Sequence, residues 1–185
     1  MGNSHIRQEK YAPIVIALHW LVLVLIVAAY ASMELRDIFE RGSAGRAMMK
    51  SSHYVIGLTI LSLAIARLIA HVAMPTPPIR PAPPAWQGLA AKAVHAALFA
   101  LMIALPIVGW LILSAEGEPP SYFGLQLPAL VSPDRVLAER FEEVHETIAT
   151  LGYGLIGLHV AAALYHHYVV HDNTLRRILP GRPAA

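Results

Sequence analysis

The amino-acid sequence predicts an all-α integral membrane protein, a four-helix bundle formed by one domain of residues 1–185. Three observations lead to this prediction. The chain is 56% hydrophobic and only 14% charged, whereas charged residues make up about 25% of a typical soluble domain. Four apolar segments are long enough, at about 20 residues each, to cross a bilayer as helices. No segment alternates apolar and polar residues in the manner of a membrane β-strand.

The four predicted spans cover about residues 13–33, 54–74, 89–113 and 147–170. The first follows a polar N-terminus and lacks a convincing cleavage site, so we expect a membrane span and not a removed signal peptide. The proline-rich residues 75–84 are expected to be extended and stiff. The acidic connection between the third and fourth spans is expected to hold a short surface helix near residues 133–143.

Charge and cysteine content exclude several classes of function. The pI is near 9.0, but no basic run or recognition motif accompanies it, so no nucleic-acid partner is expected. The absence of cysteine excludes disulfides, thiolate haem ligation and iron–sulfur ligation. Lys and Arg are slightly more frequent at the two termini and in the proline-rich connection than in the other connections. By the positive-inside rule, we expect both termini to be cytoplasmic.

The histidines carry the functional signal. His145 and His159 lie fourteen residues apart, which is about four helical turns, so they share one face about 21 Å apart along the axis. A helix crossing a hydrocarbon layer of about 30 Å can therefore present one histidine near each membrane surface. His19 lies inside the first span and His53 at the start of the second. Ionisable residues within spans are costly and usually functional.

Alternating helix directions place these histidines at two levels, pairing His19 with His159 and His53 with His145. Each pair suits the axial ligation of one haem iron, and bundle cores commonly hold such cofactors. Two protein ligands leave no open position on the iron, which favours electron transfer. Zinc or copper transport usually needs more ligands close together, and the spans hold no acid apart from Glu146 at an entrance. We therefore expect two haems.

Arg67 follows His53 by fourteen residues and so repeats the same-face spacing. A buried arginine needs an anionic partner, and a haem propionate would provide one. Snorkelling to the interface is the alternative. Glycines near the histidines either leave room for macrocycles or permit close helix packing; they are Gly57, Gly152, Gly154 and Gly157.

The other histidines have less defined roles. His95 opens the third span and is the rival of His19 as a ligand. His166 and His167 either handle protons at a quinone site, since histidine titrates near neutrality, or face water at the interface. Three further histidines lie at helix ends or in the N-terminus and receive no role; they are His5, His71 and His171.

Several segments resemble the small bacterial cytochrome b561 family, most closely its superoxide oxidase branch. The matching segments are LHWLVLVLIVAAYASMELR, PTPPIRP, ALPIVGW and HETIATLGYGLIGLHVAAALYHHYVVHDNTLRRILP. The resemblance implies a multi-pass protein of the bacterial inner membrane with two haem b groups, and the family's ligand positions match His19, His53, His145 and His159. It also implies that superoxide is oxidised on the periplasmic side and that ubiquinone is the acceptor.

Three functions follow as hypotheses. The first is a superoxide:ubiquinone oxidoreductase that needs no protein partner. A surface that attracts the superoxide anion should be positively charged. The net charge of the two outer connections is instead negative, although they contain one basic cluster of Arg36, Arg41, Arg46 and Lys50. The second is a cytochrome b subunit between a partner dehydrogenase or hydrogenase and the quinone pool, with the acidic connections as a docking face. The third is a histidine-lined carrier of haem or metal.

Overall fold

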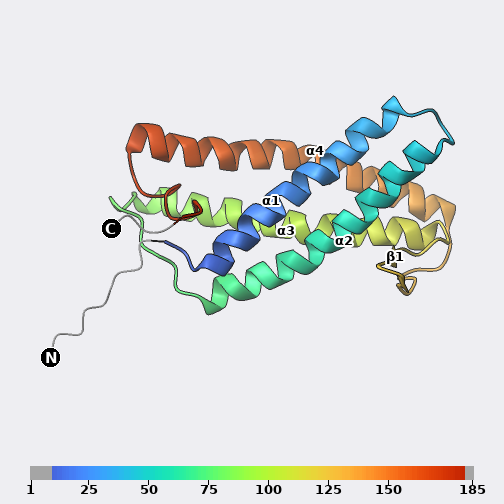
Figure 1. Cartoon of the computed structure of the whole chain (residues 1–185), viewed down its shortest axis with the longest axis horizontal. Coiled ribbons are helices and arrows are strands. Elements are labelled where there is room, and N and C mark those ends of the chain that lie inside the picture. The colour runs from blue at the N-terminus through green and yellow to red at the C-terminus, as the bar shows by residue number, and fades with distance from the viewer. Residues whose placement is uncertain (1–9, 182–185) are drawn as a thin grey trace.

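Four long helices make up most of the chain in a computed structural model that describes residues 10–181 (Figure 1). They are α1 (Pro13–Glu34), α2 (Ala44–Ala73), α3 (Ala85–Ala115) and α4 (Arg135–Tyr165). A π-helical turn, η2 (His166–Val170), prolongs α4, and a 3-10 turn, η1 (Leu35–Ile38), follows α1. All four helices are long and apolar enough to cross a membrane, so the predicted fold class is confirmed. One residue named above, His5, lies outside the described residues.

The bundle has two distinct ends. A small antiparallel hairpin of β1 (Ser121–Tyr122) and β2 (Leu125–Gln126) marks one of them, here called the hairpin end (Figure 1). At the other, the terminal end, the Tyr11 N–H donates to the carbonyl of Arg177 at 3.1 Å. The proline-rich residues 75–84 also lie at the terminal end and form no helix or strand, as the proline content predicts.

Two helices begin well before the predicted spans. α2 starts ten residues earlier than expected, where the Ser43 hydroxyl accepts a hydrogen bond from the Arg46 N–H. α4 starts twelve residues early, capped by Asp134, which accepts from the Leu137 N–H. Residues 135–143 are helical, as expected for the stretch near 133–143, but they form the first turns of α4 and not a separate surface helix. Hydropathy locates the lipid-embedded part of a helix, whereas side-chain caps locate its first turn.

Neighbouring helices pack in chain order, α1 on α2, α2 on α3 and α3 on α4. A small apolar core lies between them, comprising Val22, Ala29, Ile60, Ala64 and Met102. Many large apolar side chains point outward instead; Val24, Val27, Ile69 and Val72 are all more than 60% exposed. An apolar exterior is what a helix in contact with lipid requires.

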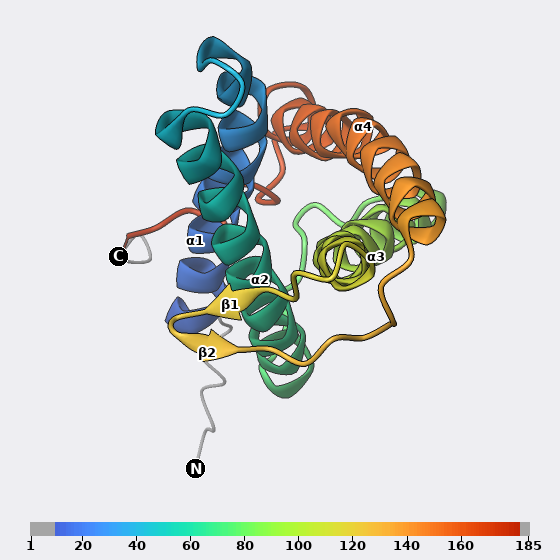
Figure 2. The ribbon, with the colours of Figure 1, turned by 90° about the vertical axis from the view of Figure 1, so that its right-hand side faces the viewer.

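In the described part of the chain, the Cα atoms of α1 and α4 make no contact within 8 Å. Figure 2, viewed from the hairpin end, shows α1 and α2 on one side and α3 and α4 on the other. Long side chains bridge the two sides. The Tyr30 hydroxyl donates to the carbonyl of Ala149 at 2.8 Å, and the Tyr153 hydroxyl donates to Glu34 at 2.7 Å. Side-chain hydrogen bonds thus connect α1 and α4, although their backbones do not come close together.

Replacing Gly152 by alanine is expected to destabilise the protein, although alanine normally favours a helix by about 1 kcal/mol. A Cβ at this position would overlap the Tyr30 hydroxyl and crowd Leu101. Overpacking of this kind typically costs about 1–3 kcal/mol. Gly154→Ala is the matched control, because a Cβ there meets nothing within 4 Å. Thermal unfolding in detergent should show a lower Tm for the first variant only; equal Tm values would contradict the packing role of Gly152.

Candidate functional site

The structure brings His53 of α2 and His145 of α4 together near the hairpin end, with ring centroids 6.2 Å apart. Near the terminal end, His19 of α1 and His159 of α4 lie 6.4 Å apart. Given a metal–nitrogen bond of about 2 Å, as for zinc, imidazoles on opposite sides of one metal have centroids roughly 6 Å apart. Both separations match that arrangement.

His95 also converges on His159, at a centroid distance of 5.4 Å. That distance is shorter than the one expected across a shared metal ion. His95 is exposed, whereas His19 and His159 are half-buried. The geometry therefore favours His19 over His95 as the partner of His159. Among the described residues, no three His, Cys, Asp or Glu side chains form a group able to hold a bare metal ion.

The imidazole of His53 is oriented by the end of α1. Its Nδ1 lies 3.0 Å from the carbonyl of Ala29, which also accepts from the Ser32 hydroxyl at 2.7 Å. A carbonyl only accepts hydrogen bonds, so Nδ1 must carry the proton. Nε2 then keeps a free lone pair. A backbone carbonyl that fixes the tautomer is the usual support for a metal-ligating histidine.

His145 has no comparable support. Its Nδ1 is buried beside the backbone of Leu105, yet it makes no well-formed hydrogen bond. The ring packs across from Gly109, where a Cβ would lie 3.5 Å from the imidazole. An unpaired buried polar atom is costly. The ring is therefore placed by α3 and α4 packing, not by its own hydrogen bonds.

A cavity of about 390 Å³ opens at the level of His53 and His145. This volume lies within the range of about 300–1,000 Å³ that is typical of cofactor and ligand pockets. Its walls are mostly apolar, and at Gly57 a Cβ would meet nothing within 4 Å. The donor set, the apolar walls and the missing side chain at Gly57 together fit a planar iron macrocycle. The lining includes Tyr30, His53, Gly57, Gly109, Trp110 and His145.

Arg67 lies at the level of the His19 pair. Its Nη2 is 2.7 Å from His19 Nδ1, and its guanidinium lies 5.5 Å from the centre of the Phe99 ring. No carboxylate within residues 10–181 forms an ion pair with it. Guanidinium only donates, so in this contact His19 accepts at Nδ1. An anionic partner for Arg67 is therefore not supplied by the described protein.

The four glycines divide into different roles. Gly57 faces the cavity, as expected if it leaves room for a macrocycle. Gly152 instead allows close packing against Tyr30. Gly154 is nine residues beyond His145 and so points to about the opposite side of α4. A Cβ at Gly157 would meet nothing within 4 Å.

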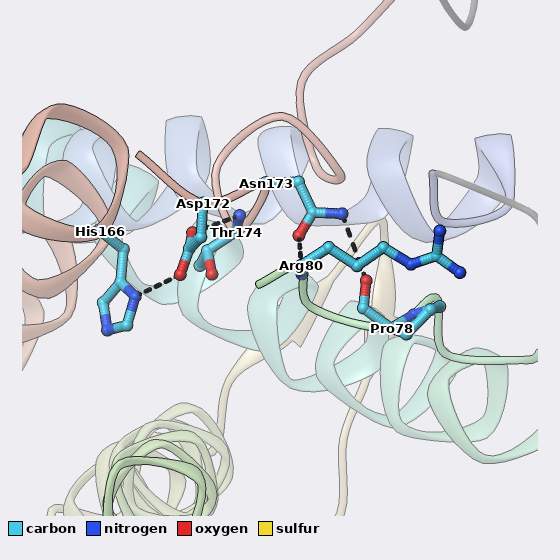
Figure 3. Close-up of polar contacts among 6 residues, drawn as sticks. All are labelled: Pro78, Arg80, His166, Asp172, Asn173 and Thr174. Carbon is cyan, nitrogen blue, oxygen red and sulfur yellow. Dashed lines mark hydrogen bonds and ion pairs between the residues drawn. The ribbon is translucent and has the colours of Figure 1, made fainter. Parts of the chain in front are cut away.

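Residues after η2 fold back over the terminal end (Figure 3). The His166 imidazole lies 2.5 Å from the Asp172 carboxylate, which also accepts from the Thr174 N–H at 2.8 Å. Asn173 ties this segment to the proline-rich residues, accepting from the Arg80 N–H and donating to the carbonyl of Pro78. His167 has a buried Nδ1 that finds no hydrogen-bond partner within residues 10–181. The segment thus links α4 to the connection between α2 and α3.

The sequence patterns did not predict the contacts of Asp172 with His166 or of Ser32 with His53. Asp172 is the only acid after Glu146, and it directly follows a histidine-rich helix end, which is a usable signal for an ion pair. Ser32 offered none, because a serine in an apolar helix usually bonds to its own backbone. It does so here, and the shared acceptor Ala29 brings it beside His53.

Replacing Asp172 by asparagine should lower the free energy of unfolding by about 1–3 kcal/mol at pH 7, the cost of a lost charged hydrogen bond. Burial raises the pKa of this carboxyl, but the Thr174 N–H and His166 outweigh it, so the pKa lies below its usual 3.8. A lowered pKa stabilises the fold above pH 3.8, and this contribution is lost as the pH falls further. The Tm difference should therefore be full at pH 7 and shrink below about pH 4. A difference that persists unchanged in acid would contradict the ion pair; Glu118→Gln is the exposed control.

Comparison with known proteins agrees with this arrangement. Residues 10–181 match the family model described as prokaryotic cytochrome b561. The chain is 41% identical to the probable superoxide oxidase CybB of Yersinia pestis, over 93% of this chain and 97% of that protein. It is 38% identical to cytochrome b561 homolog 1 of Escherichia coli K12, over 94% and 99% of the two chains. Cytochrome b561 homolog 2 of the same organism is 30% identical over 92% of each. The family match over residues 10–181, together with relatives that align along more than 90% of the chain, places this four-helix protein in the prokaryotic cytochrome b561 family of membrane electron-transfer proteins that bind haem b.

Proposed function

We propose that the chain binds two haem b groups and oxidises superoxide to oxygen while reducing ubiquinone. Haem b held between two histidines supplies one-electron oxidation and reduction without an open coordination position. The single observation that carries the haem part of this proposal is the presence of two histidine pairs with centroid distances of 6.2 and 6.4 Å. His53 and His145 are the proposed axial ligands at the hairpin end, and His19 and His159 those at the terminal end.

Arg67 is the proposed anion-binding residue of the terminal-end site. Its present contact with His19 requires Nδ1 to accept, which leaves the proton on Nε2. A neutral imidazole that binds metal through Nε2 carries its proton on Nδ1 instead, and it cannot accept from Arg67. The guanidinium must then find another acceptor, and a haem propionate offers two oxygens for a bidentate contact.

The proposed reaction takes one electron from each of two superoxide anions. Ubiquinone accepts both electrons and two protons, and the products are two oxygen molecules and one ubiquinol. The choice of superoxide as donor is supported by the 41% identity to a protein named probable superoxide oxidase. The histidine geometry supports the proposed haem sites, and it carries no information about the electron donor.

We place the chain in the bacterial inner membrane with the hairpin end toward the periplasm and both termini in the cytoplasm. The slight excess of basic residues at the terminal end supports this orientation. Superoxide would approach the hairpin end, where the basic residues are partly neutralised. Arg46, for example, lies 2.7 Å from Asp37. Steering of the anion then depends on the cations left unpaired there.

Rapid mixing of the purified haem-loaded protein with superoxide tests this function. The haem absorbance should change to that of the reduced form far faster than superoxide decays, and added ubiquinone should be converted to ubiquinol. Superoxide dismutase should abolish both signals. If the haems stay oxidised under these conditions, superoxide is not the donor.

A second function is favoured by the exposed surface of the hairpin end. Exposed acids there include Glu116, Glu118, Glu139, Glu142 and Glu143, and Phe123 at the tip of the hairpin is 81% exposed. Such a surface suits docking of a dehydrogenase or hydrogenase that feeds electrons through this chain to quinone. A redox subunit that co-purifies would support this alternative, and full activity of the single polypeptide would count against it.

A further inference from the structure

Arg36 occupies an unusual position at the hairpin end. It lies in η1, directly after α1, and lines the same cavity as His53 and His145. Its side chain is only 28% exposed. The Nε atom is buried and has no hydrogen-bond partner among the described residues. A guanidinium is always charged, and a buried donor of a charged group requires a hydrogen-bond acceptor. Arg36 Nε has none among the described residues.

The acids around the cavity do not supply that partner. Asp37 forms an ion pair with Arg36 Nε at 3.7 Å, which is too long for a hydrogen bond, and the same carboxylate lies 2.7 Å from Arg46. Glu34 accepts a hydrogen bond from the Tyr153 hydroxyl. Glu146 also lines the cavity but forms no ion pair with Arg36. Arg36 therefore borders the cavity with one long ion pair, which it shares with Arg46, and with a buried Nε–H that makes no hydrogen bond among the described residues.

We propose that Arg36 binds a carboxylate of the macrocycle held between His53 and His145. This inference rests on the proposed function and extends it to a residue outside the ligand set. A haem propionate is an anion attached to an apolar ring, so it requires a cation at the edge of an apolar pocket. Arg36 provides that cation at the hairpin end, as Arg67 does at the terminal end. Each cofactor would then have two histidines and one arginine.

The test compares haem-loaded Arg36→Gln, Arg36→Lys and Arg41→Gln proteins. Arg41 is an exposed arginine of the same connection and is not part of the cavity wall, so it controls for loss of charge alone. Haem release is followed by transfer to an excess of haem-free myoglobin. The hairpin-end component is identified as the one missing from His145→Ala protein.

Arg36→Gln should release the hairpin-end haem roughly tenfold faster, the effect of one lost charge-assisted hydrogen bond. Its midpoint potential should also fall, because loss of a nearby cation favours the oxidised form. Arg36→Lys should keep the potential but release haem faster than the parent, since lysine cannot make the bidentate contact. Arg41→Gln should match the parent in both measurements.

Unchanged release and potential in Arg36→Gln would overturn the proposal. The Arg36→Gln protein could instead keep its rate of haem release and its midpoint potential but be reduced more slowly by superoxide. That result would also overturn the proposal, because Arg36 would then bind superoxide and not the macrocycle. Retention of both haems by His145→Ala protein is a different result. It would refute the proposed ligand set and is therefore distinguishable from failure of the Arg36 contact.

Discussion

Replacing His145 by alanine is expected to remove one haem b from the chain and leave the other in place. The cavity at the hairpin end then keeps only His53 of its two proposed ligands. Loss of a ligand should weaken haem affinity by more than about 100-fold, because loss of a mere supporting contact to a ligand already costs about 10- to 100-fold. His159→Ala should remove the other haem instead. Haem quantitation and the optical spectrum of each purified variant measure the effect.

His71→Ala is the control for these variants, because His71 is exposed near the terminal end and has no assigned role. It should retain the full haem content. His95→Ala and His19→Ala separate the two rival partners of His159. Only His19→Ala should lose the terminal-end haem. Loss of that haem from His95→Ala alone would identify His95 as the ligand and contradict the choice based on ring-centroid distances.

Replacing Gly57 by phenylalanine should also abolish haem binding at the hairpin end. The aromatic side chain would enter the cavity, since a Cβ at this position contacts nothing within 4 Å. The added volume would occupy space needed by the macrocycle without disturbing the protein packing. The spectrum of the variant should therefore resemble that of His145→Ala, with the terminal-end haem unaffected.

Gly154→Phe is the matched control for Gly57→Phe. It adds the same side chain to a helix glycine on the exposed side of α4. Gly154 lies about two and a half turns beyond His145 and so points to the opposite side of the helix. This variant should keep both haems. Loss of haem from both glycine variants would point to general damage to the fold, and loss from neither would show that Gly57 does not border the cofactor.

Much of the framework could be predicted because one-dimensional patterns encode it. Runs of about 20 apolar residues locate membrane helices. The fourteen-residue spacing of His145 and His159 places two side chains on one helix face. Alternating helix directions then predict the partners, and the structure brings His53 and His19 to those two histidines.

Other features depend on helix packing or on short local turns and caps, and they leave no such pattern. The convergence of His95 on His159 depends on how α3 is rotated against α4. The early starts of α2 and α4 depend on single capping side chains in polar connections. The position of Arg36 beside the cavity depends on a short 3-10 turn after α1. None of these changes the hydropathy of the chain.

The haem-to-protein ratio of the purified chain distinguishes two haem sites from one. We expect two b-type haems per polypeptide, one for each histidine pair, measured by pyridine haemochrome absorbance against an amino-acid analysis of the same sample. A ratio of one haem per polypeptide in fully loaded protein would contradict this expectation, because one of the two pairs would then hold no haem.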